Sequence, residues 1–360
     1  MAGRFRVVDT GVMEGRLNIA IDQAMIEEHQ AGRIPDTFRF MRFPPTALIG
    51  RHQALRQEID VEYCRSHGVG IVRRITGGGA IFLDEGQLGW GLVFHRKALG
   101  ATCLAGLASD ICEAVAAGLR RLGVDARYRP RNDIEVDGRK ISGTGGFFDG
   151  DTLIYQGTVL VDMDPGAMVA ALRVPRAKLE KRQLDSAAQR VVTLRELLGP
   201  VTPTLPAIQH ALLEAFSARF DLVWESQPLT PAEESLAREH YREEIGTDEF
   251  VAQVDDPASD RDFAVGTHTG AGGTVTTYLR LEGVARKRIG QALITGDFFV
   301  APPRVVFDLE AALRGAYVAE ADEIIERFFR ERPINALSVT AADFQASLDG
   351  ALAAASAQRP

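Results

Sequence analysis

The sequence lacks the features that mark several classes of protein. No apolar run among its 360 residues approaches the roughly 20 that a bilayer-spanning helix needs. The opening residues, MAGRFRVVDTG, lack the apolar core of a signal peptide. Lys and Arg number 41 against 49 Asp and Glu, so a formal charge of −8 provides no broad positive surface for nucleic acid or anionic lipid. We therefore expect a cytoplasmic monomer that binds neither nucleic acid nor membrane.

Cysteine is scarce as well. Cys64, Cys103 and Cys112 are scattered and form no CxxC pair, and the seven His residues show no HExxH spacing. An odd number of isolated cysteines predicts neither a disulfide framework nor a cysteine-bound zinc. Free cysteines are among the most buried residues in proteins, so we interpret these three as reduced, buried thiols.

The spacing of apolar residues predicts an α+β fold. Strands are expected at 37–42, 46–50, 69–75, 79–83, 89–94, 134–136, 140–142 and 153–161, and helices at 17–28, 104–122, 166–172, 193–198, 205–218 and 230–244. Asp137-Gly138, between two of these strands, favours a tight hairpin turn. Short turns between strands and separate blocks of helices are typical of a mixed or antiparallel sheet with packed helices, not of a doubly wound parallel sheet.

An acidic stretch marks an expected domain boundary. Residues 230–262 contain eleven acidic and three basic residues, which accounts for the whole net charge of the chain. We predict a catalytic domain over 1–245, an acidic linker over 246–262 and a small α+β C-terminal domain over 263–360. In that last domain, strands are expected at 273–281 and 290–295, and helices at 308–314, 319–330 and 341–355.

A triple glycine lies between two expected strands, in the run Arg73-Arg74-Ile75-Thr76-Gly77-Gly78-Gly79-Ala80-Ile81-Phe82. Three residues without a Cβ let the backbone turn tightly and bring its N–H groups close to an anion. The adjacent arginines offer forks of donors for phosphate oxygens. No Gly-Lys-Ser/Thr follows, which excludes a Walker loop, and Phe82 replaces the last glycine of the dinucleotide fingerprint. The residues fit a phosphate-binding loop and a glycine-rich hairpin beside solvated arginines equally well.

A lysine follows the expected hairpin turn, in the run Arg131-Asn132-Asp133-Ile134-Glu135-Val136-Asp137-Gly138-Arg139-Lys140-Ile141-Ser142-Gly143. Lysines at strand edges are usually solvated, and the alternative for Lys140 is a fixed charge that stabilises negative charge in a transition state. Asn132 and Asp133 fit ordinary turn chemistry, positioning of the lysine, or Mg²⁺ binding. Net basic runs at 120–140 and 173–190 suit a small anionic ligand, although solvated helix faces give similar counts.

Together these motifs resemble those of lipoate–protein ligases within the wider biotin/lipoate ligase family. The matching residues are Ile49-Gly50-Arg51-His52-Gln53, Arg73 to Gly86, Arg131-Asn132-Asp133, Lys140-Ile141-Ser142-Gly143, Lys178-Leu179, Ser186 and Arg190-Val191. Gly296-Asp297-Phe298-Phe299, Leu309-Glu310 and Leu313-Arg314-Gly315 resemble the accessory domain of full-length ligases. The chain departs from the family pattern at Leu83 (usually His), at Gln87 (usually Asn) and at Gly89 (usually polar), which concerns the acyl pocket.

The resemblance implies a class II synthetase-like catalytic domain and a two-step reaction. Lipoate and ATP, with Mg²⁺, would give lipoyl-AMP and pyrophosphate, and the lipoyl group would then pass to a lysine of a carrier protein. The resemblance implies Lys140 as the catalytic residue and Asp133 as the metal ligand. It implies an ATP and lipoyl-AMP site formed by Arg74, Gly77, Gly78, Gly79, Ala80, Ile81, Phe82, Asn132, Asp133, Lys140, Ser142 and Gly143. Room for the acyl chain is expected beside Gly78 and Gly79.

Other functions stay open at this point. An octanoyl or lipoyl transferase of the same fold would use a cysteine thioester and no ATP, but none of the three cysteines matches a nucleophile motif, and the accessory-domain residues favour a ligase. A non-catalytic binder of lipoylated carriers is supported only by Leu83 and Gln87. A biotin ligase is disfavoured because its Gly-Arg-Gly-Arg adenylate loop is missing.

Overall fold

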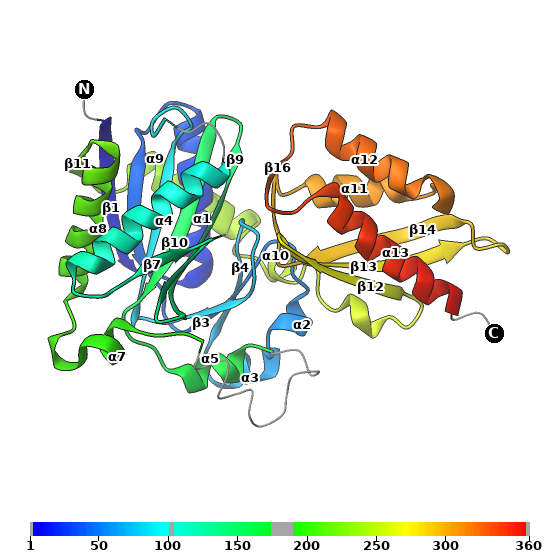
Figure 1. Cartoon of the computed structure of the whole chain (residues 1–360), viewed down its shortest axis with the longest axis horizontal. Coiled ribbons are helices and arrows are strands. Elements are labelled where there is room, and N and C mark those ends of the chain that lie inside the picture. The colour runs from blue at the N-terminus through cyan, green and yellow to red at the C-terminus, as the bar shows by residue number, and fades with distance from the viewer. Residues whose placement is uncertain (1–2, 101–103, 131, 174–189, 358–360) are drawn as a thin grey trace. The chain divides into compact units, whose positions relative to one another are not determined.

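The computed structural model describes residues 3–100, 104–130, 132–173 and 190–357. The chain, coloured by residue number in Figure 1, divides into two compact units that interleave in sequence. The first unit comprises Met1–Leu48, Ile59–Arg73 and Ile81–Val251, and the second Ile49–Glu58, Arg74–Ala80 and Ala252–Pro360. The triple glycine thus belongs to the same unit as the C-terminal residues. The domain bounds of 1–245, 246–262 and 263–360 stay a prediction.

A large mixed sheet forms the centre of the first unit, with strand order β11-β1-β2-β6-β10-β9-β8-β7. Its strands are β1 (Gly3–Val12), β2 (Thr37–Arg42), β6 (Gln87–His95), β7 (Arg127–Arg129), β8 (Asp133–Val136), β9 (Arg139–Asp149), β10 (Thr152–Leu160) and β11 (Leu222–Ser226). Strand β1 runs parallel to β2 and β11, and the other pairs are antiparallel. A smaller sheet, β4-β3-β5, contains β3 (Thr46–Ile49), β4 (Gly70–Arg73) and β5 (Ile81–Leu83).

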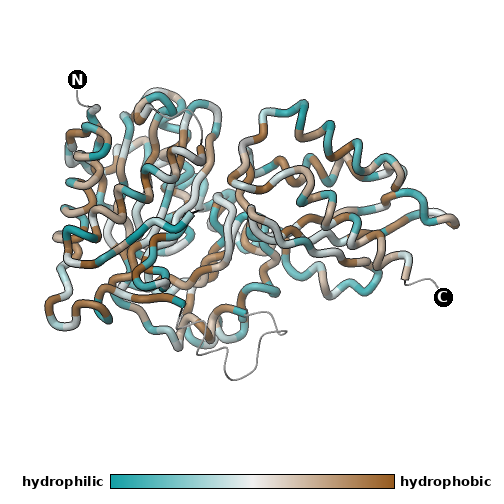
Figure 2. The backbone as a smooth tube through the Cα atoms, viewed as in Figure 1, coloured by the Kyte–Doolittle hydropathy of each residue, from teal (hydrophilic) through white to brown (hydrophobic). Residues whose placement is uncertain are grey.

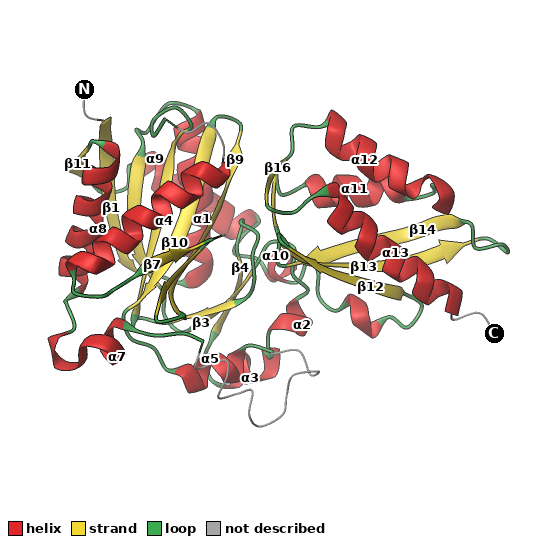
Figure 3. Ribbon diagram, viewed as in Figure 1, coloured by secondary structure: helices red, strands yellow, loops and turns green. Residues whose placement is uncertain are grey.

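Helices cover both faces of the large sheet (Figure 3). Helices α1 (Gly15–Gln30) and α9 (Pro231–Glu243) pack together on one face, and α4 (Leu104–Arg121) and α8 (Leu205–Phe220) on the other. Apolar and hydrophilic residues alternate along these helices (Figure 2), as expected for helices with one face buried. The shorter helices are α2 (Leu55–Glu58), α3 (Val61–Ser66), α5 (Pro165–Ala171), α7 (Leu194–Leu198) and α10 (Asp248–Val251), with a 3₁₀ turn at Gly199–Val201.

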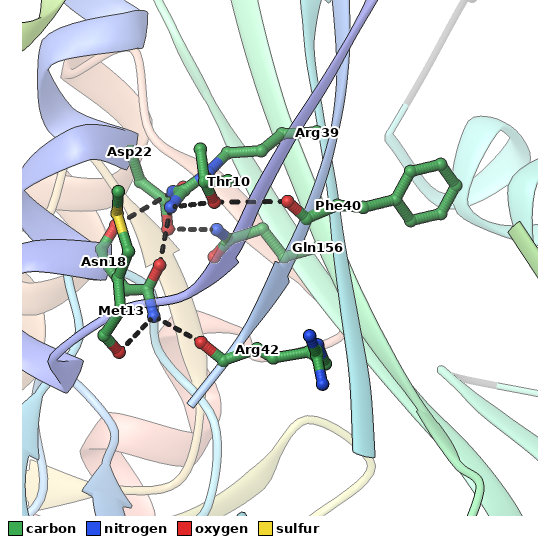
Figure 4. Close-up of polar contacts among 8 residues, drawn as sticks. All are labelled: Thr10, Met13, Asn18, Asp22, Arg39, Phe40, Arg42 and Gln156. Carbon is green, nitrogen blue, oxygen red and sulfur yellow. Dashed lines mark hydrogen bonds and ion pairs between the residues drawn. The ribbon is translucent and has the colours of Figure 1, made fainter. Parts of the chain in front are cut away.

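The two faces of the sheet are buried by different chemistry. On the α4 and α8 side, the rings of Phe38, Trp90 and Phe216 form an aromatic cluster with centroids 5.2–6.2 Å apart. On the α1 side, Arg39 of β2 forms a buried ion pair with Asp22 of α1, with Nη1 and Oδ1 2.7 Å apart (Figure 4). The predicted α+β class, with a mixed sheet and packed helices, is confirmed.

The second unit contains a smaller antiparallel sheet of order β12-β13-β14 and its own core. Its strands are β12 (Ala264–Gly270), β13 (Gly273–Glu282) and β14 (Arg288–Gly296), with β15 (Phe299–Ala301) paired to β16 (Asn335–Leu337). Its helices are α11 (Val305–Leu313), α12 (Ala321–Glu331) and α13 (Ala341–Ala357), with 3₁₀ turns at Pro257–Ser259 and Val318–Glu320. No helix in the described parts of either unit is long and apolar enough to cross a membrane.

Candidate active site

A tight turn at Asp137-Gly138 places Lys140 at the start of β9. Both turn residues have positive φ, 50° and 76°, which is the left-handed geometry of a two-residue hairpin. The predicted hairpin is therefore confirmed. The pairing of β8 with β9 shifts register between Ile134 and Glu135, and such an irregularity re-aims the side chains beside it.

The amine of Lys140 is held in one place. Its Nζ lies 2.7 Å from Oδ1 of Asp133. A Cβ on Gly143 would lie 2.6 Å from both Cε and Nζ of the lysine, so the glycine leaves the space that the lysine occupies. The backbone is fixed as well, because the N–H of Lys140 donates to the carbonyl of Arg190 at 2.8 Å and its carbonyl accepts from the N–H of Val192 at 2.9 Å. Lys140 is thus a positioned positive charge and not a freely solvated one.

This amine lies on the face of the sheet that α1 covers. Gln156 of β10 pairs with Gly145 on one side and with Gly91 on the other. Its side-chain amide donates to Asp22 of α1, as Figure 4 shows. The side chain of Gln156 and the paired positions Gly145 and Gly91 therefore face α1. Because side chains alternate along a strand, Gly143 faces the same way as Gly145.

Thr144 faces the opposite side, toward α4. Its hydroxyl donates to the carbonyl of Asn132 at 3.0 Å and lies 2.8 Å from the hydroxyl of Tyr155 and 3.3 Å from the thiol of Cys112. Its N–H donates to the same carbonyl at 2.8 Å, and the Asn132 amide donates to the Thr144 carbonyl. This network clamps the turn that carries Asp133, the partner of the lysine. Sequence reasoning missed Thr144 and Tyr155, because nothing in their local sequence distinguishes them from other buried strand residues.

The two cysteines that the structure describes have the wrong environment for a nucleophile. Burial raises the pKa of the Cys64 thiol to about 11 and also raises the pKa of Cys112 above its usual value. The thiolate is the reactive form, so both side chains are poor nucleophiles near neutral pH. The prediction of reduced, buried thiols is confirmed for these two, and Cys103 lies outside the described residues.

The other predicted residues of the first unit lie on its strands. Ser142 pairs with Ile134 and is fully buried, and its hydroxyl has no hydrogen-bond partner among the described residues. Ile81 and Phe82 belong to β5 and pair with β3. Arg131, Lys178-Leu179 and Ser186 lie outside the described residues.

Arg73, the first arginine of the predicted phosphate-binding pair, has a structural role in the first unit. Its side chain is fully buried, and its guanidinium donates to the carbonyls of Phe250 at 3.2 Å and Val251 at 2.8 Å. These donors satisfy the backbone of α10, so Arg73 is a buried structural arginine and not a solvated one.

In the second unit, Arg74 organises the triple glycine. Its Nη2 donates to the carbonyls of Gly77 at 2.7 Å and Gly79 at 2.8 Å. The N–H of Gly78 donates to the carbonyl of Phe298 at 3.2 Å. Arg74 is 9% exposed, its Nη1 has no partner among the described residues, and burial lowers its pKa to about 10. The donors of Nη1 are therefore the ones that the described residues leave unused on this guanidinium.

The glycines of this loop are needed for close packing. A Cβ on Gly77 would lie 2.1 Å from the carbonyl oxygen of Phe298, and a Cβ on Gly78 would lie 2.6 Å from the ring of Phe299. At Gly79 the nearest atom would be 3.9 Å away. The space predicted for an acyl chain beside Gly78 is thus filled by the protein itself, whereas Gly79 and Ala80 are partly exposed.

A metal site made by the protein alone is not apparent in the described parts of the chain, since no group of three or more His, Cys, Asp or Glu could hold an ion. Asp133, the predicted Mg²⁺ ligand, is the carboxylate paired with Lys140. In nucleotide sites, Mg²⁺ commonly takes one or two carboxylates together with phosphate oxygens. A single carboxylate at this position fits that pattern only if a nucleotide supplies the other ligands.

Comparisons with known proteins agree on one family. Residues 14–217 match the lipoyl protein ligase A/B catalytic domain. Lipoate-protein ligase A subunit 1 of Thermoplasma acidophilum is 29% identical over 260 residues, which cover 69% of this chain and 96% of that protein. Octanoyltransferase LipM of Geobacillus kaustophilus is 27% identical over 272 residues, covering 68% and 97%.

Solved structures give the same result. The lipoate protein ligase of a bipartite archaeal lipoylation system from Thermoplasma acidophilum superposes with a TM-score of 0.63 at 27% identity, covering 71% of this chain and 97% of that one. A lipoate-protein ligase A bound with ATP gives a TM-score of 0.61 at 27% identity, covering 71% and 100%. LipL1 of P. falciparum, 15% identical, shares the fold over 92% of this chain and 95% of its own, with a TM-score of 0.71. The chain therefore belongs to the lipoyl protein ligase A/B catalytic domain family, which includes lipoate-protein ligases and octanoyltransferases.

Proposed function

We propose that this protein is an ATP-dependent lipoate–protein ligase. The observation that carries the proposal is the Lys140 amine, held by Asp133 over Gly143 on the α1 face of the sheet. A fixed cation in such a place can bind a phosphate and an acyl oxygen in turn, which is what adenylate formation and acyl transfer require.

The first step joins two anions. A carboxylate oxygen of lipoate attacks the α-phosphorus of ATP, and pyrophosphate leaves. The positive charge of Lys140 offsets the repulsion between carboxylate and phosphate. Asp133 would hold Mg²⁺, and the ion would supply further charge neutralisation at the phosphates. In the second step, a lysine amine of the carrier attacks the acyl carbon and loses a proton, AMP leaves, and Lys140 stabilises the charge that develops on the acyl oxygen.

The nucleotide part of the proposal rests on the triple-glycine segment. The free Nη1 of Arg74 and the open backbone at Gly79 and Ala80 are suited to phosphate oxygens. A relative that is 27% identical was solved with ATP bound. We assign ATP binding to Arg74 and to the backbone of this segment, with Gly77 and Gly78 serving to shape it.

The acyl chain has a candidate path along the sheet. Gly89 of β6 pairs with Thr158 of β10 and with Met41 of β2. Because Gly157 pairs with Thr144, Gly143 of β9 lies next to Thr158 in the same row. We call Gly143, Thr158, Gly89 and Met41 the glycine row. It begins at the Lys140 amine and crosses the strands on the α1 face with no large side chain before Met41. We propose that the acyl chain lies along this row with its carboxyl group at Lys140.

The main rival is an ATP-independent acyl transferase, the activity named for several relatives of similar identity. Such an enzyme needs a thiolate beside the acyl carbon. Cys112 is the described cysteine nearest to this strand, but it contacts Thr144, on the face opposite to the Lys140 amine, and burial raises its pKa. This arrangement favours a ligase over a cysteine-based transferase.

The proposed partner is a carrier domain that presents a lysine. The archaeal relative belongs to a lipoylation system that comprises the ligase and its E2 lipoyl domain, which supports a lipoyl domain as the acceptor. We also propose that the protein is cytoplasmic and monomeric.

Lipoate-dependent exchange of pyrophosphate into ATP tests the first step, and intact mass of a lipoyl domain tests the second. We expect both with the intact protein, and we expect Lys140→Met to lower the exchange rate by at least 100-fold. Lys287→Met, at an exposed position of the second unit, serves as the matched control and should behave as wild type. The protein would instead be a transferase if an octanoyl thioester modified the carrier without ATP and this activity were lost only in a cysteine variant. Carrier binding with neither reaction would show a non-catalytic binder.

A further inference from the structure

Gln87 is a buried amide whose polar atoms have no partner in the part of the protein that the structure describes. It begins β6, pairs with Leu160 of β10 and is 2% exposed. Neither Oε1 nor Nε2 of its side chain has a hydrogen-bond partner among the described residues. Buried polar groups in native proteins nearly always have a partner, and one that lacks it within the chain indicates a role toward something that binds there.

A second glutamine on the same face provides the contrast. Gln156 also faces α1, and its amide donates to Asp22 within the Arg39 network of Figure 4. Its polar group is therefore satisfied by the fold. Gln87 and Gln156 flank the glycine row on its two sides, and of these two only Gln87 has both amide atoms without a partner across the described ranges of the chain.

The position of Gln87 relative to the row decides which part of a ligand it meets. Gln87, Gly89 and Gly91 alternate along β6 and share the α1 face. Lys140 and Gly143 belong to β9, two strands away across β10, which is roughly 10 Å. An acyl group with its carboxyl at Lys140 would therefore present its distant part to Gln87.

We propose that Gln87 is a specificity-determining residue that contacts the sulfur-bearing end of a lipoyl chain and favours it over a plain alkyl chain. The proposal rests on the proposed function. The amide N–H can donate to a ring sulfur, a weak acceptor, and the amide oxygen can accept from a thiol of the reduced form. An octanoyl chain offers neither group and would leave the buried amide unpaired. A site that holds an unpaired polar group rejects the analogue that cannot bond to it.

The test compares lipoate with octanoate in the pyrophosphate exchange reaction of the intact protein. Gln87→Met keeps the length of the side chain and removes its polar atoms. We expect the ratio of kcat/KM for lipoate to that for octanoate to fall at least fivefold, without a lower Tm, because an unpaired buried amide has been removed. Gln30→Met, at an exposed glutamine, is the matched control and should leave the ratio unchanged.

An unchanged ratio in Gln87→Met overturns the inference, and so does an equal loss with both acids, which would place the amide at the shared carboxyl end. If Gln87→Met does not fold, Gln87→Asn, which shortens the amide, should lower the ratio in its place. Absence of exchange with wild-type protein would refute the ligase proposal alone. In that case, calorimetry gives the dissociation constants of wild type and Gln87→Met for lipoate and for octanoate. The inference is overturned if the protein binds neither acid, or if the ratio of the two constants is the same in both proteins.

Discussion

Gly143→Ala separates the position of the Lys140 amine from the stability of the fold. The added methyl group would lie 2.6 Å from the Nζ and Cε atoms of the lysine, whereas ordinary contacts begin at 3.4 Å. The amine must therefore move by about 1 Å from its present place, where it lies 2.7 Å from the carboxylate of Asp133. Misplacement of a catalytic group by that distance costs on the order of 100-fold in rate.

Stability should hardly change in this variant. The displaced atoms are the end of a flexible side chain, and Gly143 does not have the positive φ that would strain an alanine. We expect the free energy of unfolding to stay within about 1 kcal/mol of wild type, since alanine in a strand interior also loses less conformational entropy than glycine. Gly70→Ala in β4, whose Cβ would make an ordinary 3.4 Å contact, is the matched control.

Pyrophosphate exchange and urea unfolding measure the two quantities, and a double variant tests the cause. If Gly143 acts through Lys140, adding Gly143→Ala to a Lys140→Ala protein should cost nothing more. Exchange at the wild-type rate in Gly143→Ala would refute the reasoning. A further loss in the Lys140→Ala background would show that the methyl group blocks substrate and does not act through the lysine.

Three more predictions follow from other parts of the chain. Thr144→Val removes the hydroxyl that donates to Asn132; urea unfolding should show a loss of about 1–2 kcal/mol, with slower exchange that a Cys112→Ala control does not reproduce. Asp22→Ala leaves the Arg39 guanidinium buried without its carboxylate and should cost about 3–5 kcal/mol in the same assay; a smaller loss would mean that water reaches the arginine. Burial raises the pKa of Glu310 to about 7, so the folded state keeps a proton that the unfolded state has released between about pH 4.5 and 7. The stabilisation that wild-type Glu310 contributes is therefore lost as the pH rises across that window. Glu310→Gln should flatten the dependence of Tm on pH there, and an unchanged dependence would contradict the argument.

Periodicity was sufficient for α1 and β2, although these elements also bury the ion pair of Asp22 and Arg39. The helix expected at 17–28 is α1, and the strand expected at 37–42 coincides with β2. Strand β1 was not predicted, and one of its buried positions holds a charged residue. Arg6 is 1% exposed and forms a buried ion pair with Glu233 of α9, far along the chain. A local sequence pattern cannot show that a carboxylate distant in the sequence neutralises and stabilises a buried arginine.

The sequence pattern did not predict that the two units interleave along the chain. The chain reads as one block, a linker and a second block, yet segments 49–58 and 74–80 belong with the C-terminal residues. The reason is visible at two glycines. A Cβ on Gly50 would lie 1.9 Å from the carbonyl oxygen of Gly78, and a Cβ on Gly77 would lie 2.1 Å from that of Phe298. These contacts join motifs that the sequence shows only as separate runs, and they give Gly50 and Gly77 a role in packing.

The arrangement of the candidate site depends on the alternation of side chains between the two faces of β9 more than on any sequence motif. Gly143 and Thr144 are neighbours, and a strand directs neighbours to opposite faces. One face holds the Lys140 amine and the glycine row, and the other holds Thr144 with Cys112. A sheet of this thickness separates a thiol on the α4 side from an acyl group on the α1 side, whatever the identity of the residues between them. In a family whose members are named both ligases and transferases, the face on which a cysteine lies is therefore a physical criterion for telling them apart. By that criterion Cys112 is a packing residue, in agreement with the role that we propose for Lys140.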